Sequence, residues 1–323
     1  MNDSHAMTAP LHVELQPLPP PSARLRRTNP SGLAPDAAFA ALRPRLFAIG
    51  YRMLGTRADA EDLVQDAWLR WHDTDPAVVQ SPEAWLVAVV TRLAIDRLRS
   101  AKTERAAYVG WWLPEPIVEV DDRTPEAIAE QTGELSLAFL WVLERLGAEE
   151  RAAFLLREVF DYDYAEVAAY LQKSEAACRQ LVHRASQRLQ RQPARQAVPE
   201  PAHRRLLERF LAAARSGERE AIQALLAEQA QLVGDGGGVV PSILKIMRGR
   251  ESIAKFYWAM ERRYGGQFVY RFARINGEPG LLRYFDGLLE SAQAFETDGD
   301  QITGIYIVRN PHKLATAPAG LQT

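Results

Sequence analysis

The spacing of apolar residues changes near His203, and this change constrains the fold more than any other feature. From Asp36 to about Arg191, apolar side chains recur every three or four residues, which is the period of amphipathic helices. After residue 203, two more helical segments are followed by apolar runs typical of strands, and Asp298-Gly299 marks a hairpin turn. Since helices and strands bury side chains with different periods, we predict a multidomain chain, all-α at first and α+β at the end.

Composition limits the function classes to which the chain can belong. A length of 323 residues suffices for more than one packed core, and a net charge of −2 does not favour nucleic-acid binding through overall positive charge. The single cysteine excludes a disulfide framework and a multi-thiolate metal site, and it fits a reducing cytoplasm. The sequence contains no apolar run long enough for a membrane helix and no secretory signal. We therefore expect a cytoplasmic protein with no membrane association, no cofactor and no bound metal.

Three amphipathic helices are predicted within residues 35–107. Asp36 and Asp59 are placed to cap the first two, and Ser81-Pro82 begins the third, because proline suits the first helical position. Short loops join these helices, so we expect them to pack as a small bundle. Residues 1–34 predict a proline-rich, disordered or extended tail, which is either a solvated leader or a basic arm that contacts nucleic acid.

Two linkers separate the remaining domains. Residues 108–134 carry seven acidic residues against one arginine, a net charge of −6 (1 − 7), and prolines punctuate them. Residues 135–192 predict a second helical domain, and residues 193–202 predict a second linker. Residues 203–315 predict an α+β domain with helices packed on one antiparallel sheet, followed by a short tail at 316–323. The elements expected in the α+β domain are helices 203–215, 218–227 and 249–263, and strands 231–233, 268–275, 281–286, 288–296 and 302–308.

A helix-turn-helix pattern occupies residues 163–190. A short helix over 164–171 is followed by a turn, and Ser174 caps the next helix, whose apolar face includes Cys178. The opposite face carries side chains suited to base edges and phosphates, namely Glu175, Ala176, Arg179, Gln180, His183 and Arg184. The alternative is an ordinary helical hairpin with a solvated basic face. Gln172 stands in the turn where a glycine is often found.

Two charged faces occur on the earlier helices. The second helix has an acidic face made of Asp59, Glu61, Asp62 and Asp66, which is either solvated or docks on a basic protein surface. The third helix has a basic face made of Arg92, Arg97, Arg99 and Lys102, beside a loop that contains His72, Asp73 and Asp75. A basic helix beside a loop suits phosphate contact and capture of an unstacked base, although a solvated face is the alternative.

These segments, in this order, resemble one family. Asp59-Ala60-Glu61-Asp62-Leu63-Val64-Gln65-Asp66-Ala67 resembles the polymerase-docking helix of bacterial sigma factors. The helix from Pro82 to Ser100 is similar to their promoter-melting region, and residues 149–190 resemble their second DNA-binding domain. Because only a short linker separates the two domains, the match is to the compact extracytoplasmic-function class.

The resemblance implies a subunit that confers promoter recognition and initiation. It implies core RNA polymerase and promoter DNA as partners, no catalysis by the chain itself, and a monomeric free state. The expected polymerase contacts are Asp59, Asp62, Gln65 and Asp66. The expected contacts to the melted minus-ten element are Arg92, Arg97, Arg99 and Ser100, with the loop Asp73–Asp75. The expected contacts to the minus-thirty-five element are Ser174, Glu175, Ala176, Arg179, Gln180, His183 and Arg184.

Three further motifs resemble the signatures of one subgroup. They are Trp112-Leu113-Pro114-Glu115-Pro116, Asp235-Gly236-Gly237-Gly238 and Asn310-Pro311-His312-Lys313-Leu314, with His312 where the pattern has an acidic residue. The subgroup carries a fused SnoaL-like domain, an α+β cone related to nuclear transport factor two and polyketide cyclases. Since glycine permits close backbone contact, we expect the glycine-rich turn to approach the linker motif, with Trp111 and Trp112 as anchors and Glu115 as a polar contact. We hypothesise that this contact regulates the sigma domains in cis.

The cone leaves alternatives open. Its aromatic residues either line a pocket for a small ligand of unknown identity or fill the core: Phe268, Tyr270, Phe272, Tyr284, Phe285 and Tyr306. His203 and His312 flank the core of the domain and form no evident catalytic pair. Two other functions remain as alternatives, a small-molecule-responsive DNA-binding regulator that acts without polymerase, and a cyclase-like enzyme joined to a DNA-binding module.

Overall fold

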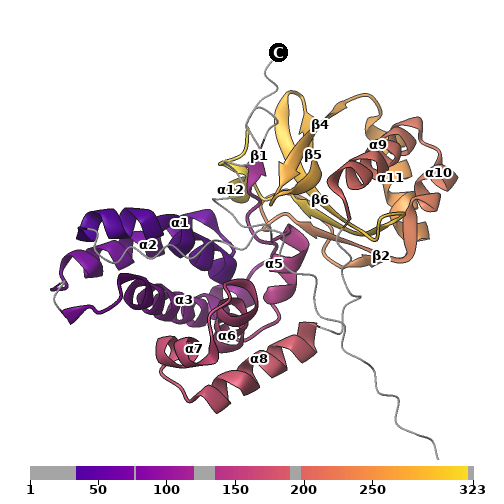
Figure 1. The fold of residues 1–323 in the computed structure, drawn as a ribbon. Coiled ribbons are helices and arrows are strands. Elements are labelled where there is room, and N and C mark those ends of the chain that lie inside the picture. Colours follow the sequence, from indigo (N-terminus) through magenta and orange to yellow (C-terminus); the bar gives the residue numbers. More distant parts are fainter. Residues whose placement is uncertain (1–33, 76–77, 120–134, 190–197, 319–323) are drawn as a thin grey trace, which may run out of the picture.

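The computed structural model describes residues 34–75, 78–119, 135–189 and 198–318. The predictions for the proline-rich tail at 1–33, for the acidic residues 120–134 and for most of the second linker lie outside these described residues. Within the described ranges, the chain has a helical half and a half built on a sheet, and the two are joined by extensive contacts (Figure 1). The predicted multidomain class, all-α followed by α+β, is confirmed.

Three helices open the helical half, and two of their predicted caps are wrong. They are α1 (Pro35–Leu54), α2 (Arg57–His72) and α3 (Pro82–Ala106). Helix α1 begins at Pro35, whose fixed φ suits a first helical position, so Asp36 already lies inside the first turn. Helix α2 begins two residues before Asp59, because the Thr56 hydroxyl accepts the hydrogen bond from the Asp59 backbone N–H.

Four more helices and one π-helical turn follow. They are α5 (Leu137–Leu143), α6 (Ala148–Phe154), η2 (Leu155–Val159), α7 (Tyr164–Leu171) and α8 (Glu175–Leu189). The bounds of α7 match the prediction, and Ser174 caps α8 by accepting a hydrogen bond of 3.2 Å from the Ala177 N–H. Gln172 adopts the left-handed conformation at the end of α7, with φ of 53°. The turn therefore forms without the expected glycine, at a cost of about 1 kcal/mol in backbone strain.

The two groups of helices share one hydrophobic core, in which residues of α1, α2 and α3 pack with residues of α6, α7 and α8. A buried polar network crosses this interface. The Arg45 Nε donates to the Tyr162 hydroxyl at 2.7 Å, and that hydroxyl donates to the Glu83 carboxylate at 2.9 Å. Arg45 also donates to the Phe160 carbonyl at 3.1 Å. Because these groups are buried, the network favours one relative placement of the helical groups.

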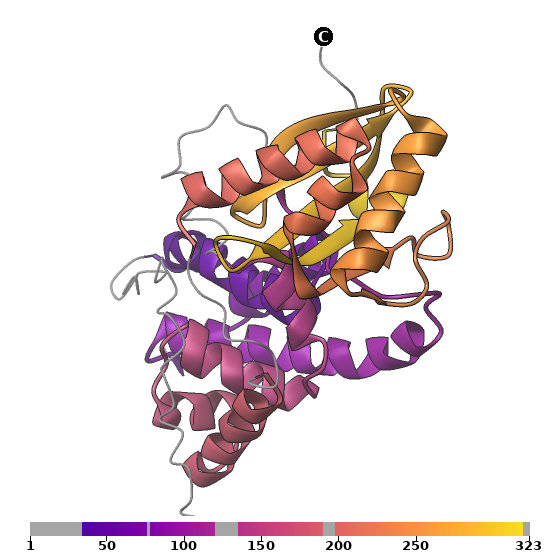
Figure 2. The same cartoon turned by 90° about the vertical axis from the view of Figure 1, so that its right-hand side faces the viewer.

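The second half is a sheet in the order β1-β4-β5-β6-β7-β2-β3. Its strands are β1 (Val118–Glu119), β2 (Leu226–Asp235), β3 (Met247–Arg248), β4 (Phe268–Ile275), β5 (Glu278–Phe285), β6 (Leu288–Thr297) and β7 (Ile302–Val308). Helices α9 (Glu200–Ser216), α10 (Arg219–Ala224) and α11 (Arg250–Tyr264) cover one face, as Figure 2 shows, and α12 (Pro311–Leu314) follows β7. The expectation of a purely antiparallel sheet is wrong, because β2 and β7 are parallel neighbours. The long chain between them provides the connection that parallel strands need.

Helix α5 packs on both halves. Its Leu140 and Leu143 belong to the helical core, whereas Leu137 and Trp141 belong to a cluster with residues of the sheet. The Trp141 ring lies 5.5 Å from the ring of Tyr306 on β7. In Figure 1 the helix accordingly lies between the helical half and the sheet. The first helix of the predicted second helical domain is thus also a covering helix of the C-terminal sheet.

We predict that Tyr162→Phe destabilises the protein through the interface between the helical groups. The substitution keeps the ring but removes the hydroxyl that pairs with Arg45 and Glu83, so the free energy of unfolding should fall by about 1–3 kcal/mol. Urea titration followed by circular dichroism measures this change. Tyr164→Phe is the matched control, because the half-buried Tyr164 ring stacks with Arg179 and its hydroxyl has no hydrogen bond among the described residues. Equal stability of the two variants would contradict the prediction.

Candidate functional site

The linker after α3 lies between the two halves, where it meets the glycine-rich turn and the segment around α12. We call these three segments, residues 108–119, 235–238 and 310–316, the clamp. At its centre, Asp235 has no exposed surface. One carboxylate oxygen accepts from the Tyr108 hydroxyl at 2.7 Å and from the Gly237 N–H at 3.0 Å. The other accepts from the Leu113 N–H at 2.9 Å and from the Lys313 ammonium at 2.7 Å. A fully buried carboxylate thus obtains four donors from three separate segments, which satisfies it and ties those segments together.

The ends of β2 and β7 place these groups. Because the two strands are parallel neighbours, both end at this edge of the sheet. The Asp235 carbonyl accepts from the N–H groups of Arg309 at 2.7 Å and Asn310 at 3.0 Å. The Asn310 side chain donates to the Tyr108 hydroxyl at 2.8 Å and accepts from the His312 N–H at 3.0 Å. His312 contributes its backbone here and its imidazole is exposed, so an acidic side chain is not needed at this position for the hydrogen bond.

Trp112 anchors the linker on the helical half. Its ring lies between two cations, with the Lys313 ammonium 3.9 Å and the Arg105 guanidinium carbon 4.0 Å from the ring centroid. Gly55 ends α1 with φ of 77°, and a Cβ atom on this residue would lie 2.5 Å from the Trp112 ring. Glycine is therefore required both by the turn and by the approach of the tryptophan. Trp111 is less buried, and its ring lies 6.3 Å from that of Trp141.

Glu115 joins the linker to both halves. Its carboxylate accepts from the Arg57 N–H at the start of α2, at 2.7 Å, and from the Thr316 hydroxyl near the C-terminus, at 3.2 Å. Its backbone N–H donates to the Gly55 carbonyl at 2.8 Å, and its carbonyl accepts from the Tyr51 hydroxyl at 2.7 Å. The side chain is buried, and each of its oxygens has a donor.

The structure also shows contacts of the clamp that the sequence analysis did not predict. Asn276, in the two-residue turn between β4 and β5, donates to the Tyr51 hydroxyl of α1 at 2.7 Å. It also exchanges hydrogen bonds with Ile117, which extends the pairing of β1 with β4. The only signal in the sequence was the Asn276-Gly277 pair, which favours a hairpin turn but not a contact with α1. Tyr108 gave no comparable signal.

Burial changes the proton affinities in the clamp. It lowers the pKa of Lys313 to about 8, although the Asp235 carboxylate acts in the opposite direction. The contact with Asp235 favours the protonated form of Lys313, which is the form that makes the ion pair. Burial also raises the pKa of Tyr108 well above its usual value, and the neighbouring Asp235 adds to this effect. Tyr108 therefore remains a hydrogen-bond donor at every physiological pH.

The predicted minus-thirty-five residues all lie exposed at the N-terminal end and outer face of α8, and they are Ser174, Glu175, Ala176, Arg179, Gln180, His183 and Arg184. Arg179 pairs with Glu175 at 2.7 Å and lies over the Tyr164 ring. Arg184 pairs with Glu150 of α6 at 3.2 Å. The arginines are thus already ordered, and contact with DNA would exchange these pairs for phosphates or base edges.

The predicted polymerase and minus-ten surfaces meet at Arg97. Arg97 of α3 pairs with Asp59 at 2.8 Å and with Asp62 at 3.3 Å on α2. The other predicted residues on these helices, Gln65, Asp66, Arg92, Arg99 and Ser100, are exposed, and so are Asp73 and Asp75 in the loop.

One glutamate connects α3, the predicted minus-ten helix, to the helix-turn-helix. Arg99 of α3 pairs with Glu149 at 2.8 Å, and Glu149 also pairs with Lys173 of the turn between α7 and α8, at 3.2 Å. Two surfaces predicted for different promoter elements are therefore adjacent in this conformation.

A cavity of about 220 Å³ lies in the C-terminal domain, lined by Gly234, Pro241, Ser242, Ile243, Phe256, Met260, Arg283, Ile307 and Arg309. The six aromatic residues proposed as a pocket lining do not border this cavity. Tyr284 and Tyr306 are buried in the sheet core, and the Phe268 ring contacts that of Phe285, with the centroids 5.4 Å apart. Among the described residues there is no group of three or more potential metal ligands, and none of the described helices has the length and hydropathy of a membrane span.

Comparisons with known proteins match both halves. The family Sigma-70 region 2 matches residues 38–104, and the family Sigma-70, region 4 matches residues 136–189. The ECF RNA polymerase sigma factor SigJ of Mycobacterium tuberculosis is 39% identical in an alignment of 291 residues that covers 87% of this chain and 93% of SigJ. The crystal structure of the same organism's SigJ aligns with a TM-score of 0.71 and 35% identity, over 88% of this chain and 99% of that one. A probable ECF sigma factor SigI of that organism is 27% identical over 86% of this chain and 94% of its own length.

We predict that Lys313→Met strongly destabilises the clamp, because it leaves the buried Asp235 carboxylate without its cation. The free energy of unfolding should fall by about 3–5 kcal/mol in urea titration. Adding Asp235→Asn should cost less in the Lys313→Met background than in the native chain, since the two charges act as a pair. Lys255→Met, which removes an exposed lysine from α11, is the control. Strictly additive costs would refute the coupling.

Proposed function

The chain belongs to the extracytoplasmic-function sigma factors of RNA polymerase, and from this premise we propose that its clamp holds the two DNA-binding helical domains in a closed arrangement that opens for initiation. Sigma factors bind core RNA polymerase and promoter DNA, and they confer promoter recognition. The observation that carries the proposal is that the C-terminal domain contacts both helical domains at once. It reaches the first through the hydrogen bond from Asn276 to Tyr51 of α1, and the second through the contact of Tyr306 with Trp141 of α5.

The spacing of promoter elements supports the need for opening. The minus-ten and minus-thirty-five elements lie about 25 base pairs apart, which is on the order of 80 Å at 3.4 Å per base pair. In the closed arrangement, Arg99 of the minus-ten helix and Lys173 of the helix-turn-helix pair with the same glutamate, Glu149. The two surfaces therefore have to separate before each can occupy its own element.

We assign Asp59, Asp62, Gln65 and Asp66 to polymerase docking in this proposal, and Arg97 links that step to DNA binding. A basic polymerase surface would compete with Arg97 for Asp59 and Asp62, since all three charges are exposed enough to exchange partners. Release would leave the Arg97 guanidinium available for the promoter. Docking and DNA contact would then be coupled through one ion pair.

We propose that the C-terminal domain regulates the chain and catalyses no reaction, and that the protein acts in the cytoplasm, where its polymerase is. Glu290 pairs with both arginines that line the cavity, with Arg283 at 2.7 Å and with Arg309 at 2.5 Å. Burial opposes its ionisation, but the two guanidiniums outweigh this effect and keep the pKa of Glu290 below its usual range. Such a carboxylate is a weak base, which disfavours the cyclase-like alternative. Membership of the sigma family disfavours a regulator that acts without polymerase.

We predict that a disulfide across the clamp reduces initiation. A Cβ placed on Gly238 lies 3.0 Å from the Cβ of Val109, near the roughly 3.5–4.5 Å found in disulfides, and both positions are exposed. In reconstituted transcription with core polymerase, oxidised Val109→Cys/Gly238→Cys should initiate about tenfold less than the same protein after reduction.

The two single-cysteine variants, treated with the same oxidant, control for strain at Gly238, and the native Cys178 is buried. Equal initiation by the fully oxidised and reduced proteins would refute the opening step. A failure of the reduced protein and the native chain to initiate on any promoter would instead count against the assay.

We predict that polymerase docking and promoter reading are separable. Asp66→Arg reverses an exposed charge on α2 and should abolish co-elution with core polymerase, whereas Glu220→Arg makes the same charge change on α10 and should not. Arg179→Ala should keep co-elution and lower promoter-specific initiation by about 5- to 150-fold, the value of one base or phosphate contact. Normal co-elution of Asp66→Arg would contradict the docking assignment.

A further inference from the structure

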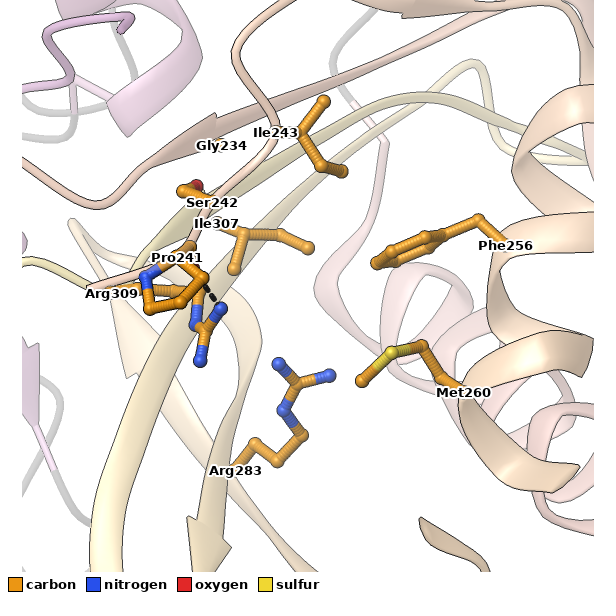
Figure 3. A pocket seen from close by; sticks show the side chains of 9 residues that line it. All are labelled: Gly234, Pro241, Ser242, Ile243, Phe256, Met260, Arg283, Ile307 and Arg309. Atoms are coloured by element: carbon orange, nitrogen blue, oxygen red, sulfur yellow. Dashed lines mark hydrogen bonds between the residues drawn. The ribbon is translucent and has the colours of Figure 1, made fainter. Parts of the chain in front are cut away.

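The cavity in the C-terminal domain has an apolar wall and a cationic wall. Phe256 and Met260 project from α11 on one side, and Ile243 and Ile307 add apolar surface across the space from them (Figure 3). The guanidinium groups of Arg283 on β5 and Arg309 after β7 point into the same space from the opposite side. Its volume of about 220 Å³ exceeds the roughly 150 Å³ of an engineered apolar cavity that accommodates benzene.

Arg283 lines this cavity and has a buried donor without a partner among the described residues. The side chain is 98% buried, with a relative exposure of 2%. Its Nε donates to Glu290 at 2.7 Å, and its guanidinium carbon lies 4.6 Å from the centroid of the Phe268 ring. Its Nη1 is buried and has no hydrogen-bond partner among the described residues. A buried guanidinium N–H without an acceptor is costly, so an acceptor supplied from outside the chain would be favoured there.

Arg309 repeats the pattern. It pairs with the other Glu290 oxygen at 2.5 Å and donates to the Pro241 carbonyl, while its Nε is buried without a partner among the described residues. Glu290 neutralises one of the two arginines, so one positive charge remains beside the cavity. A monoanion would balance that charge, whereas a dianion would exceed it.

We infer that this cavity binds a small carboxylate with a compact apolar body. The carboxylate pairs with the guanidinium groups of Arg283 and Arg309, and the body packs on Phe256, Met260 and Ile243. Carboxylate oxygens suit guanidinium donors, and the apolar wall supplies the remaining contact area.

The cavity and the clamp share a loop. Pro241, Ser242 and Ile243 line the cavity, and the same loop begins with the glycine-rich turn. On its other side, Gly238 lies against Val109 of the linker, and Leu244 lies against Gly110. Arg309 and Gly234 of the cavity also directly adjoin Asn310 and Asp235 of the clamp. A ligand that draws Arg309 from the Pro241 carbonyl therefore moves the loop that holds the linker; this regulatory consequence rests on the proposed function, whereas the binding site does not.

The test uses benzoate as the probe, because its ring matches the cavity and it carries one negative charge. Calorimetric titration of the full chain should detect benzoate, and neutral benzamide should bind at least about tenfold more weakly. Arg283→Lys keeps a charge beside Glu290 but removes the free Nη1, and it should weaken benzoate binding about fivefold or more. Arg262→Met, which removes a charge from the same domain outside the cavity, should leave the affinity within about twofold.

A second variant keeps the test decisive if Arg283→Lys fails to fold. Ile243→Phe places a larger side chain in the cavity and leaves both arginines unsubstituted. It should abolish benzoate binding. Inorganic phosphate should be a poor ligand for every variant. Benzoate binding that survives both cavity variants, or no binding by the folded native chain at millimolar benzoate, would overturn the inference. Phosphate binding tighter than benzoate binding would overturn the inference that the ligand has an apolar body.

Amide hydrogen exchange separates the ligand site from its consequence. The N–H groups of Leu113 and Gly237, which donate to Asp235, should change their exchange rates when benzoate is added. Unchanged rates with proven binding would overturn the coupling to the clamp. The disulfide experiment needs no ligand, so a failure of the proposed opening step is recognised independently.

Discussion

The carboxylate of Asp235 is the constraint on which the assembled structure depends. A charge with no exposed surface is tolerated only if its oxygens are satisfied, and here the donors come from the linker, the glycine-rich turn and α12. The linker can supply Tyr108 and Leu113 only if it passes directly over the ends of β2 and β7, which are adjacent because they pair in parallel. The sheet topology, the path of the linker and the position of the C-terminal helix are therefore consequences of one another. Removing α12 would leave the buried carboxylate without its cation, and removing the linker would leave it without two of its four donors.

The two halves are joined by elements with two faces rather than by one flat interface. Helix α5 contributes Leu140 and Leu143 to the helical core and Leu137 and Trp141 to the sheet cluster. The linker does the same with polar groups, since the two oxygens of Glu115 bind donors from α2 and from the C-terminal segment. Opening would expose both faces, so it requires compensation by a partner that binds the open form more tightly. Core polymerase and promoter DNA are partners of that kind in the proposed mechanism.

Local patterns predicted the elements well, because periodicity and turn residues act over a few neighbours. The bounds of α7, β4 and β7 and the turn at Asp298-Gly299 agree with the prediction. The caps of α1 and α2 were wrong because a proline or threonine just upstream competes with an aspartate for the same position. The two-residue strands β1 and β3 were missed, since their pairing depends on distant partners. The contacts of Tyr51, Tyr108 and Asn276 depend on tertiary placement alone, and no local pattern carries that information.

The resemblance predicted which segments meet, but it did not predict all the side chains that form the bonds between them. The glycine-rich turn was expected to approach the linker motif, with Trp111 and Trp112 as anchors and Glu115 as a polar contact, but the ion pair of Asp235 with Lys313 was not predicted. These two residues lie one residue from Gly234 and four residues from Arg309 of the cavity, respectively. If ligand binding changes the free energy of opening, linkage requires that opening changes the ligand affinity by the same factor. Polymerase binding would then change the ligand affinity by the same factor as the ligand changes polymerase binding. A ligand bound to the C-terminal domain would therefore regulate the sigma domains without a separate anti-sigma protein.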